Sequence, residues 1–198
     1  MMDPAAMTKM WEIAFPDCPP EAADLKYACA SRWVRIHSLP GSKRYPETEA
    51  ERQQVLGRYR EVLQQLGATP QSTVVCVTQT FSARGKAPLR DDPRGGWEWM
   101  SWDESPEDPP WPENEPLPDP YERWVHLHVH ELSVSELDPL LTSVADDESC
   151  GVIVLPPDFA WAFHPYDGGA DIIAPTSLER DLLLERFAEW LSPRPDRL

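Results

Sequence analysis

Three histidines at alternate positions, His126, His128 and His130, are the residues whose type and spacing most resemble a metal site. On a β-strand, a period of two places the three imidazoles on one side, and imidazole is the commonest transition-metal ligand. Alternate side chains stand about 6.5 to 7 Å apart, whereas zinc ligands converge to about 2 Å from the metal. We therefore expect at most a two-histidine chelate, at His126 and His128. The alternative is a half-buried strand whose imidazoles face solvent or a loop while three apolar residues face the core: Val125, Leu127 and Val129.

A loop rich in glycine and serine suggests a second kind of chemistry, the binding of an anion. It spans residues 41–45 and leads toward an expected helix N-terminus, where a phosphate or carboxylate group is stabilised. Its sequence lacks the GxxxxGK[ST] spacing of a P-loop. We expect an anion-binding site formed by four side chains: Arg35, His37, Lys43 and Arg44.

Pairing within the chain is the alternative for these cations. Residues 25–46 hold five Lys and Arg and no Asp or Glu, whereas residues 91–198 carry a net charge of −19. We expect the two loop cations to find partners in the carboxylates Asp167 and Asp171, or in the acidic tract at 104–122. Such pairs, where they are exposed, stabilise a fold only weakly.

The chain as a whole is acidic, with a formal net charge of −16 and a pI of about 4.6. Binding to a phosphate backbone requires Lys and Arg, so we expect no nucleic acid as the main partner. A basic protein partner suits this charge, because complementary fields accelerate association. A basic toxin is one such partner, and the chain would then act as an immunity or inhibitor protein.

Tryptophans and prolines mark a candidate interface in the acidic half. Residues 105–120 hold seven prolines and no basic residue, which favours an extended, acidic loop at 104–120. Trp97, Trp99, Trp102 and Trp111 lie in this acidic setting, and aromatic anchors surrounded by charge suit a protein interface. The alternative is that the same tryptophans form an ordinary core. We expect six interaction residues, in this loop and in a later hairpin: Trp111, Glu113, Glu115, Tyr166, Asp167 and Asp171.

The first half of the chain predicts a strand, a helix and a second strand. "RWVRIHS" alternates like a strand, and a short helix or irregular segment precedes it at 20–30. Thr48 followed by Glu51 is a capping-box signature, and apolar residues then recur at helical spacing to Leu66, before Gly67. The apolar run "STVVCVTQT" predicts a buried strand. The residues that follow it, to about 96, are expected to form a loop.

The second half adds strands and two helices. "GWEWMSWDE", "YERWVHLHVHEL" and "GVIVLPP" predict strands, and "SVSELDPLLTSVADDE" a short helix with Pro139 in its first turn. Asp167-Gly-Gly predicts a hairpin turn, and Thr176 with Glu179 caps a closing helix. We expect six residues to line one face of that helix: Leu178, Leu182, Leu183, Phe187, Trp190 and Leu191. This order indicates a single α+β domain, 1–198, with one central, mostly antiparallel sheet and two or three packed helices.

Composition and missing motifs bound the function. The chain has 198 residues, 41% of them hydrophobic, with no apolar stretch of signal-peptide or membrane-spanning length, so we expect a cytoplasmic protein without a membrane partner. The four cysteines are too far apart for a CxxC clip and are expected to be buried, reduced thiols. Common enzyme signatures are absent, so we favour a non-enzymatic protein and expect no cofactor.

Two sequence blocks resemble a known family. They are "IHSLPGSKRYPETEAERQQVLGRYREVLQQLG" and "WAFHPYDGGADIIAPTSLERDLLLERFAEWLS". Both are similar to segments of an uncharacterised bacterial family, a domain of unknown function, in which an HSLP-SKRY strand and loop precedes a helix and a PYDGGAD hairpin precedes the final helix. The resemblance implies no activity or cofactor. It draws attention to ten positions: His37, Ser38, Lys43, Arg44, Tyr45, Tyr166, Asp167, Gly168, Gly169 and Asp171.

These observations favour an acidic, cytoplasmic protein-interaction module with a basic partner. The alternative is a small enzyme or ligand-binding domain that recognises a phosphate or carboxylate group through the 41–45 loop, with His37 or His164 nearby.

Overall fold

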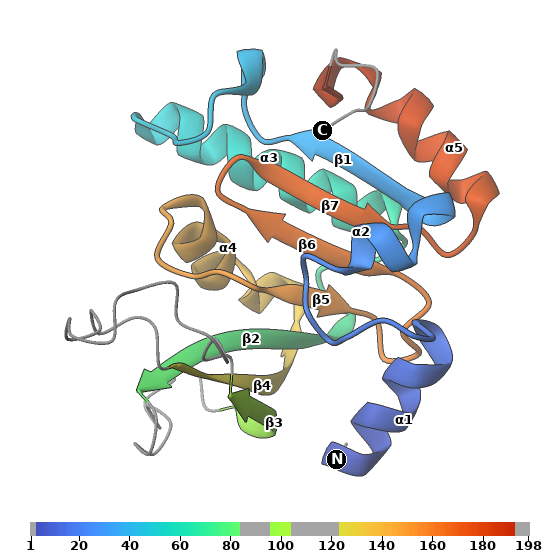
Figure 1. The fold of residues 1–198 in the computed structure, drawn as a ribbon. Helices are drawn as coiled ribbons and strands as arrows, with labels where there is room; N and C mark the ends of the chain where they lie inside the picture. The colour runs from blue at the N-terminus through green and yellow to red at the C-terminus, as the bar shows by residue number, and fades with distance from the viewer. Residues whose placement is uncertain (1–2, 84–95, 104–122, 193–198) are drawn as a thin grey trace, which may run out of the picture.

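One antiparallel sheet organises the fold. The computed structural model describes residues 3–83, 96–103 and 123–192. Within them, seven strands form a sheet in the order β1-β7-β6-β5-β2-β4-β3, and every neighbouring pair is antiparallel (Figure 1). The strands are β1 (Trp33–His37), β2 (Thr73–Ala83), β3 (Trp97–Asp103), β4 (Arg123–Ser133), β5 (Ile153–Leu155), β6 (Ala162–Tyr166) and β7 (Gly169–Ile173). The predicted α+β class with one central antiparallel sheet is thus confirmed.

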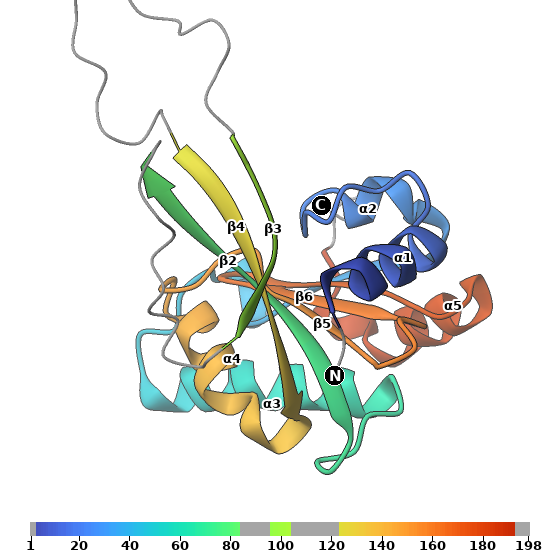
Figure 2. The same cartoon turned by 90° about the horizontal axis from the view of Figure 1, so that it is seen from below.

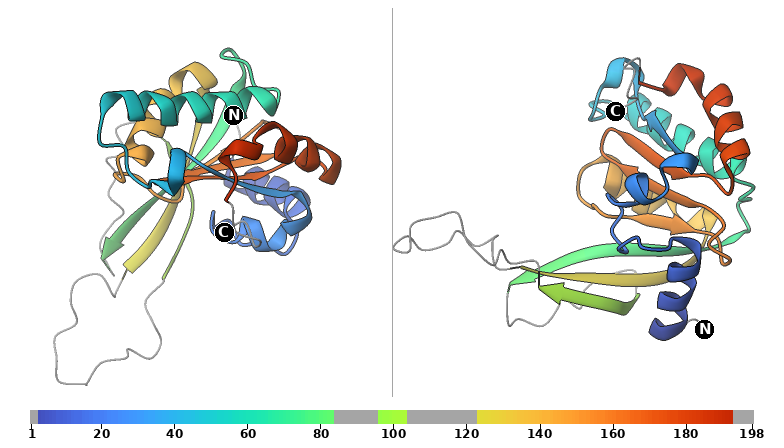
Figure 3. Two further views of the ribbon diagram at one scale, coloured as in Figure 1. Left: turned by 90° about the horizontal axis from the view of Figure 1, so that it is seen from above. Right: turned by 45° about the vertical axis from the view of Figure 1, so that its right-hand side comes forward.

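Helices cover both faces of this sheet and flank one edge. They are α1 (Pro4–Ala14), α2 (Leu25–Ala28), α3 (Glu49–Gln65), α4 (Asp138–Ala145) and α5 (Ser177–Arg186). Figure 2 and Figure 3 show α3 and α4 on one face, α1 and α2 on the other, and α5 beside the edge strand β1. The long strands β2 and β4 twist away from the β1-β7-β6-β5 part. Strand β3 pairs with β4 and forms the edge of the sheet on that side.

Two hydrophobic cores follow from strand alternation, since successive side chains point to opposite faces. Val34 and Ile36 of β1 pack against α3 and α4 in one core. Val125, Leu127 and Val129 of β4 pack against α1 in the other, as predicted for these three residues.

The capped helix was predicted most accurately. Thr48 is the N-cap of α3, its hydroxyl accepts from the Glu51 N–H, and the Glu51 carboxylate accepts from the Thr48 N–H. The closing helix α5 has the same threonine cap, because the Thr176 hydroxyl accepts from the Glu179 N–H, but the Glu179 carboxylate accepts from the Thr176 hydroxyl at 2.9 Å and does not complete the predicted capping box. Both starts are local chemistry, so sequence is enough to find them.

The face predicted for the closing helix is wrong in part. Leu183 and Phe187 are buried, whereas Leu178 and Leu182 are 69% and 57% exposed. On a helix, the row formed by Leu178 and Leu182 lies opposite Phe187, so only one of the two rows can face the core.

The helix α1 was not predicted. Asp3 is its N-cap, accepting from the Ala6 N–H at 2.9 Å, and Pro4 occupies its first turn. Met7 and Trp11 are buried against the sheet, and the Trp99 indole of β3 donates to the Thr8 hydroxyl at 2.9 Å. Asp-Pro at a chain start is the sequence signal that would have located this helix.

A β-bulge interrupts the alternation of side chains along β3. The register against β4 shifts between Glu98 and Met100, so Trp97, Met100 and Trp102 all pack toward the α1 core. A one-residue insertion moves later side chains to the other face, which is why Trp102 does not lie opposite Trp97.

The thiols and the helix lengths complete the comparison with the sequence. Cys18, Cys29 and Cys76 are buried and form no disulfide, as predicted, but Cys150 is exposed. None of the helices in the described part of the chain has the length and apolar content needed to cross a bilayer.

Candidate functional site at the junction of the two motifs

The two sequence motifs meet across three strands. In the β1–β7 pair, Arg35 lies opposite Asp171 and His37 opposite Gly169. In the β6–β7 pair, His164 lies opposite the same Asp171. The polar row Arg35–Asp171–His164 therefore runs across the sheet face that α1 and α2 partly cover.

Arg35 and Asp171 form a bidentate, largely buried ion pair. The Arg35 Nε and Nη2 atoms donate to the two Asp171 oxygens at 2.7 and 2.8 Å, and the side chains are only 16% and 4% exposed. The guanidinium lies 5.3 Å from the Trp33 ring centroid and 5.5 Å from that of Tyr166. The hydrogen bonds to Asp171 raise the Arg35 pKa despite the burial that opposes charge. This guanidinium is already satisfied within the chain.

Arg44 pairs with the hairpin turn, as expected from its charge. Its Nε atom contacts the Asp167 carboxylate, and its guanidinium lies 5.3 Å from the Tyr45 ring centroid. A hydrogen bond to Asp167 is the main cause that raises the Tyr45 pKa. The loop after β1 is thus fastened to the β6–β7 turn.

Lys43 finds different partners from those predicted. Its ammonium contacts Glu51 at 2.7 Å and Glu47 at 3.1 Å, rather than the hairpin or the acidic tract. The Glu51 carboxylate also accepts from the Glu47 and Thr48 amides. The N-terminus of α3 is therefore occupied by carboxylates of its own segment, where an external anion was expected.

His37 is held neutral. Its Nε2 lies 3.3 Å from the Ser42 hydroxyl. Burial lowers the His37 pKa, and the neighbouring charges of Arg35 and Arg58 lower it further. The proposed anion-binding set thus consists of three cations with carboxylate partners and one neutral imidazole.

Tyr59 of α3 contacts the backbone of the β6–β7 hairpin. The buried Tyr59 hydroxyl of α3 lies 2.8 Å from the Tyr166 carbonyl and 3.0 Å from the Gly169 carbonyl. A Cβ on Gly169 would lie 2.1 Å from the Ile36 carbonyl oxygen, so β1 and β7 can approach each other only with glycine here. Helical spacing of the apolar residues indicates that Tyr59 faces the core, whereas its hydrogen bonds depend on the packing of α3 against the hairpin.

His164 is the group in this row that could still accept a proton. Its Nδ1 donates to the Val152 carbonyl at 2.8 Å, which leaves Nε2 as the acceptor of a neutral ring. Burial is the main cause that lowers the His164 pKa, so the neutral form prevails at pH 7. Tyr166 lies beside it, with ring centroids 5.7 Å apart. The row could accept a proton, but the pockets of about 230 and 660 Å³ lie elsewhere, at the C-terminal end of α3.

The alternate histidines of β4 form a buried polar ladder. His126, His128 and His130 are 4%, 7% and 4% exposed, so they are more buried than predicted. Each Nε2 lies 2.8 to 3.0 Å from a hydroxyl of β2, on Ser82, Thr80 and Thr78 respectively. His126 also has Glu98 at 3.4 Å.

This ladder offers little to a metal ion. The ring centroids of His126 and His128 are 6.5 Å apart. Across the described ranges, no three His, Cys, Asp or Glu side chains are grouped closely enough to hold a metal. The two-histidine chelate stays a prediction, without a third ligand among these residues.

The predicted interaction residues divide into two groups. Trp111, Glu113 and Glu115 lie outside the described residues. Tyr166, Asp167 and Asp171 belong to the motif junction, where both carboxylates already contact arginines.

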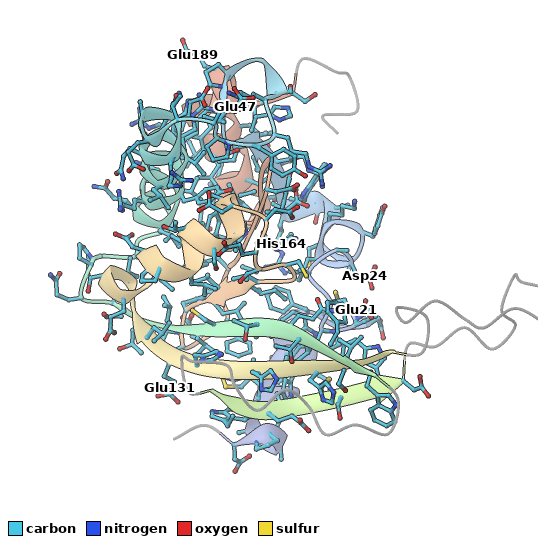
Figure 4. The ribbon with its side chains drawn as sticks, turned by 90° about the vertical axis from the view of Figure 1, so that its left-hand side faces the viewer. Glu21, Asp24, Glu47, Glu131, His164 and Glu189 are labelled. Carbon is cyan, nitrogen blue, oxygen red and sulfur yellow. The ribbon has the colours of Figure 1, made fainter. Side chains whose placement is uncertain are left out.

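Other carboxylates lie on several parts of the surface. Figure 4 shows Glu47 and Glu189 toward one end of the molecule, Glu21 and Asp24 near α2, and Glu131 on the twisted β2-β4-β3 part. Negative charge alone therefore does not single out one binding face.

Comparisons with known proteins give one match. A family model described as a domain of unknown function, DUF3885, matches residues 22–195. No curated protein and no solved structure matches the chain. The family match spans every strand of the sheet and both motifs, from the segment before α2 to the segment after α5. The chain therefore belongs to this family of domains of unknown function, DUF3885.

Proposed function

We propose that the chain is an acidic protein-interaction module that binds a basic protein partner, as an inhibitor or immunity protein does. The observation that supports this most directly is the pattern of ion pairs among the charged side chains. Its cations are largely engaged with carboxylates of the same chain, and a surplus of carboxylates remains on the surface.

The surplus can be counted in the described residues. They contain 24 Asp and Glu against 12 Lys and Arg, a difference of −12. Seven of these cations contact carboxylates: Arg35, Lys43, Arg44, Arg52, Arg60, Arg180 and Arg186. The exposed carboxylates in the same ranges that form no ion pair include Glu12, Asp17, Asp158, Glu185 and Glu189.

An unmatched negative surface has a physical consequence for association. Its field attracts a positively charged protein over roughly 8 Å at physiological salt and accelerates the encounter. It also penalises acidic competitors, because like charges in one interface cost several kcal/mol. Such a module gains rate and selectivity from charge without needing a catalytic cavity.

Recognition of a phosphate or carboxylate ligand by residues 41–45 has weaker support, because Lys43 and Arg44 already contact Glu51 and Asp167. An anion would have to displace both carboxylates. A thermal-shift series with inorganic phosphate and nucleotides separates the two functions, since a ligand at 100 times its Kd adds about 2.7 kcal/mol to stability.

Affinity capture tests the main proposal. The tagged chain is incubated with lysate of its source cells at 50 and 300 mM NaCl, and captured proteins are identified and then purified for kinetic measurements. We expect a partner with a pI above about 8, whose association rate falls steeply with salt. Recovery of only salt-insensitive or acidic proteins would contradict the proposal.

A further inference from the structure

The outward face of α5 combines exposed leucines with carboxylates. Leu178 and Leu182 lie one turn apart, and they are two of the most exposed large hydrophobic side chains in the described part of the chain, at 69% and 57%. Asp181 and Glu185 lie on the same side of the helix, because helical positions three and four apart are neighbours. An exposed apolar patch rimmed by polar residues is a feature of protein-binding surfaces.

The position of α5 makes this row part of the exterior. The helix packs against β1 and the turn at residues 30–32, beside the edge of the sheet (Figure 1). Leu183 and Phe187 provide that contact from the opposite side of the helix. The row of Leu178 and Leu182 therefore points away from the sheet.

A pocket adjoins the exposed leucines. It has a volume of about 230 Å³ and lies between α5 and the C-terminal end of α3, with an apolar lining formed chiefly by Leu66, Pro175, Leu182 and Leu183. Glu179 and Arg186 are at its margin. It can receive an aliphatic side chain from another molecule, with Leu182 as one wall.

The charges around this row favour a cationic occupant. Arg180 and Arg186 contact Asp181 and Glu61 at 2.8 and 2.6 Å, so the cations of α5 are already paired. Glu185 lies in the last helical turn, where the helix dipole disfavours a negative charge, and Glu189 follows just after it. Neither Glu185 nor Glu189 has a cationic partner among the described residues, so both can meet a cation from another molecule.

We propose that the outward face of α5, with the pocket beside Leu182, is the docking surface for a basic protein segment that carries an apolar anchor between lysines or arginines. This proposal rests on the proposed function and locates it. The anchor enters the pocket, and the flanking cations meet Glu179, Glu185 and Glu189.

Peptide binding tests this surface. The probe is a fluorescein-labelled, 18-residue peptide of leucine and lysine patterned as an amphipathic helix, and its control is a scrambled peptide of the same composition. Anisotropy is measured at 150 mM NaCl for the wild type and for the double variant Leu178→Ser/Leu182→Ser. Ile13→Ser is the matched control, because Ile13 is 72% exposed on α1.

The wild type and Ile13→Ser are expected to bind the patterned peptide at least about tenfold more tightly than the scrambled one, because only the patterned peptide buries leucine against leucine. The double variant is expected to lose this preference while its urea midpoint stays unchanged. Amide resonances perturbed by the peptide should lie within residues 176–190.

Two outcomes overturn the docking surface and are distinguishable. If the double variant retains the preference, or if the perturbed resonances lie elsewhere, the surface is wrong while the proposed function stands. If the wild type binds neither peptide, the function fails together with the surface.

Discussion

The buried pair of Arg35 and Asp171 allows a sharp test of what holds the motif junction together. Removing one member of a buried pair leaves the other charge without compensation, which typically costs about 3 to 5 kcal/mol. Because the Asp171 side chain is 4% exposed and that of Arg35 16%, little solvent screening reduces this cost. Arg35→Met and Asp171→Leu should each lower the free energy of unfolding by that amount. The double variant replaces the pair by apolar side chains and should be less destabilised than either single variant.

Arg60 and Asp138 provide a matched control. Their pair has the same bidentate geometry, at 3.1 and 2.7 Å, but both side chains are 46% exposed. Exposed pairs contribute about 0 to 1 kcal/mol, so Arg60→Met and Asp138→Leu should each change stability by no more than about 1 kcal/mol. Urea unfolding followed by tryptophan fluorescence measures all five variants, with stability compared at constant m-value.

Two results would refute the reasoning. If the Arg35 and Asp171 single variants cost no more than their Arg60 and Asp138 counterparts, burial does not govern the strength of the pair. If the double variant at Arg35 and Asp171 costs the sum of its singles, the two side chains act independently, and the junction depends on their separate packing.

Three further predictions concern the backbone and the titrating groups. Gly169→Ala should lower the free energy of unfolding by about 1 to 3 kcal/mol, because its Cβ would meet the Ile36 carbonyl. Gly57→Ala in α3 has open space around it and should raise the free energy of unfolding by about 0.5 to 1 kcal/mol; urea midpoints measure both. Burial raises the Cys18 pKa from 9.0 to about 11, so the free energy of unfolding should fall as pH rises from 9 to 11, and Cys18→Ala but not Cys150→Ala should reduce this fall in urea titrations. Burial lowers the His164 pKa, so stability present above pH 6.5 should decline as pH falls; His164→Asn, which can still donate to Val152, should lose less between pH 7.5 and 5 in the same assay.

Local chemistry made much of the fold predictable. The caps at Thr48 and Thr176 involve groups three residues apart, and the turn at Asp167 to Gly169 requires residues suited to tight turns. Alternation in β4 assigned its core face, because a strand has only two faces.

Tertiary packing determined what sequence could not. The closing helix has leucines at 182, 183 and 184, so its periodicity allows more than one inward face, and packing at the β1 edge chooses the face with Leu183 and Phe187. The bulge at Glu98 to Met100 likewise depends on pairing with β4, which the spacing of aromatic residues does not reveal.

The candidate site was predictable to the extent that it depends on charge. Opposite charges in the two motifs indicated that the loop and hairpin would touch, and Arg44 does contact Asp167. The partner of Arg35 follows only from the β1–β7 register, which requires knowing that these strands are neighbours. Lys43 pairs with Glu51 instead, because the cap of α3 already holds that carboxylate in place.

The motif junction and the α5 face should fail in different ways, since their polar groups are used differently. At the junction, Arg35, Asp171 and Tyr59 direct their polar groups to one another or to the backbone, so their loss removes stability. On α5, Leu178 and Leu182 contribute little to the core because they remain exposed. A change there should alter partner binding at unchanged stability, and a junction change should reduce binding only to the extent that it unfolds the chain. Measuring both quantities on both sets of variants therefore separates the part of this sequence that specifies a fold from the part that would serve recognition.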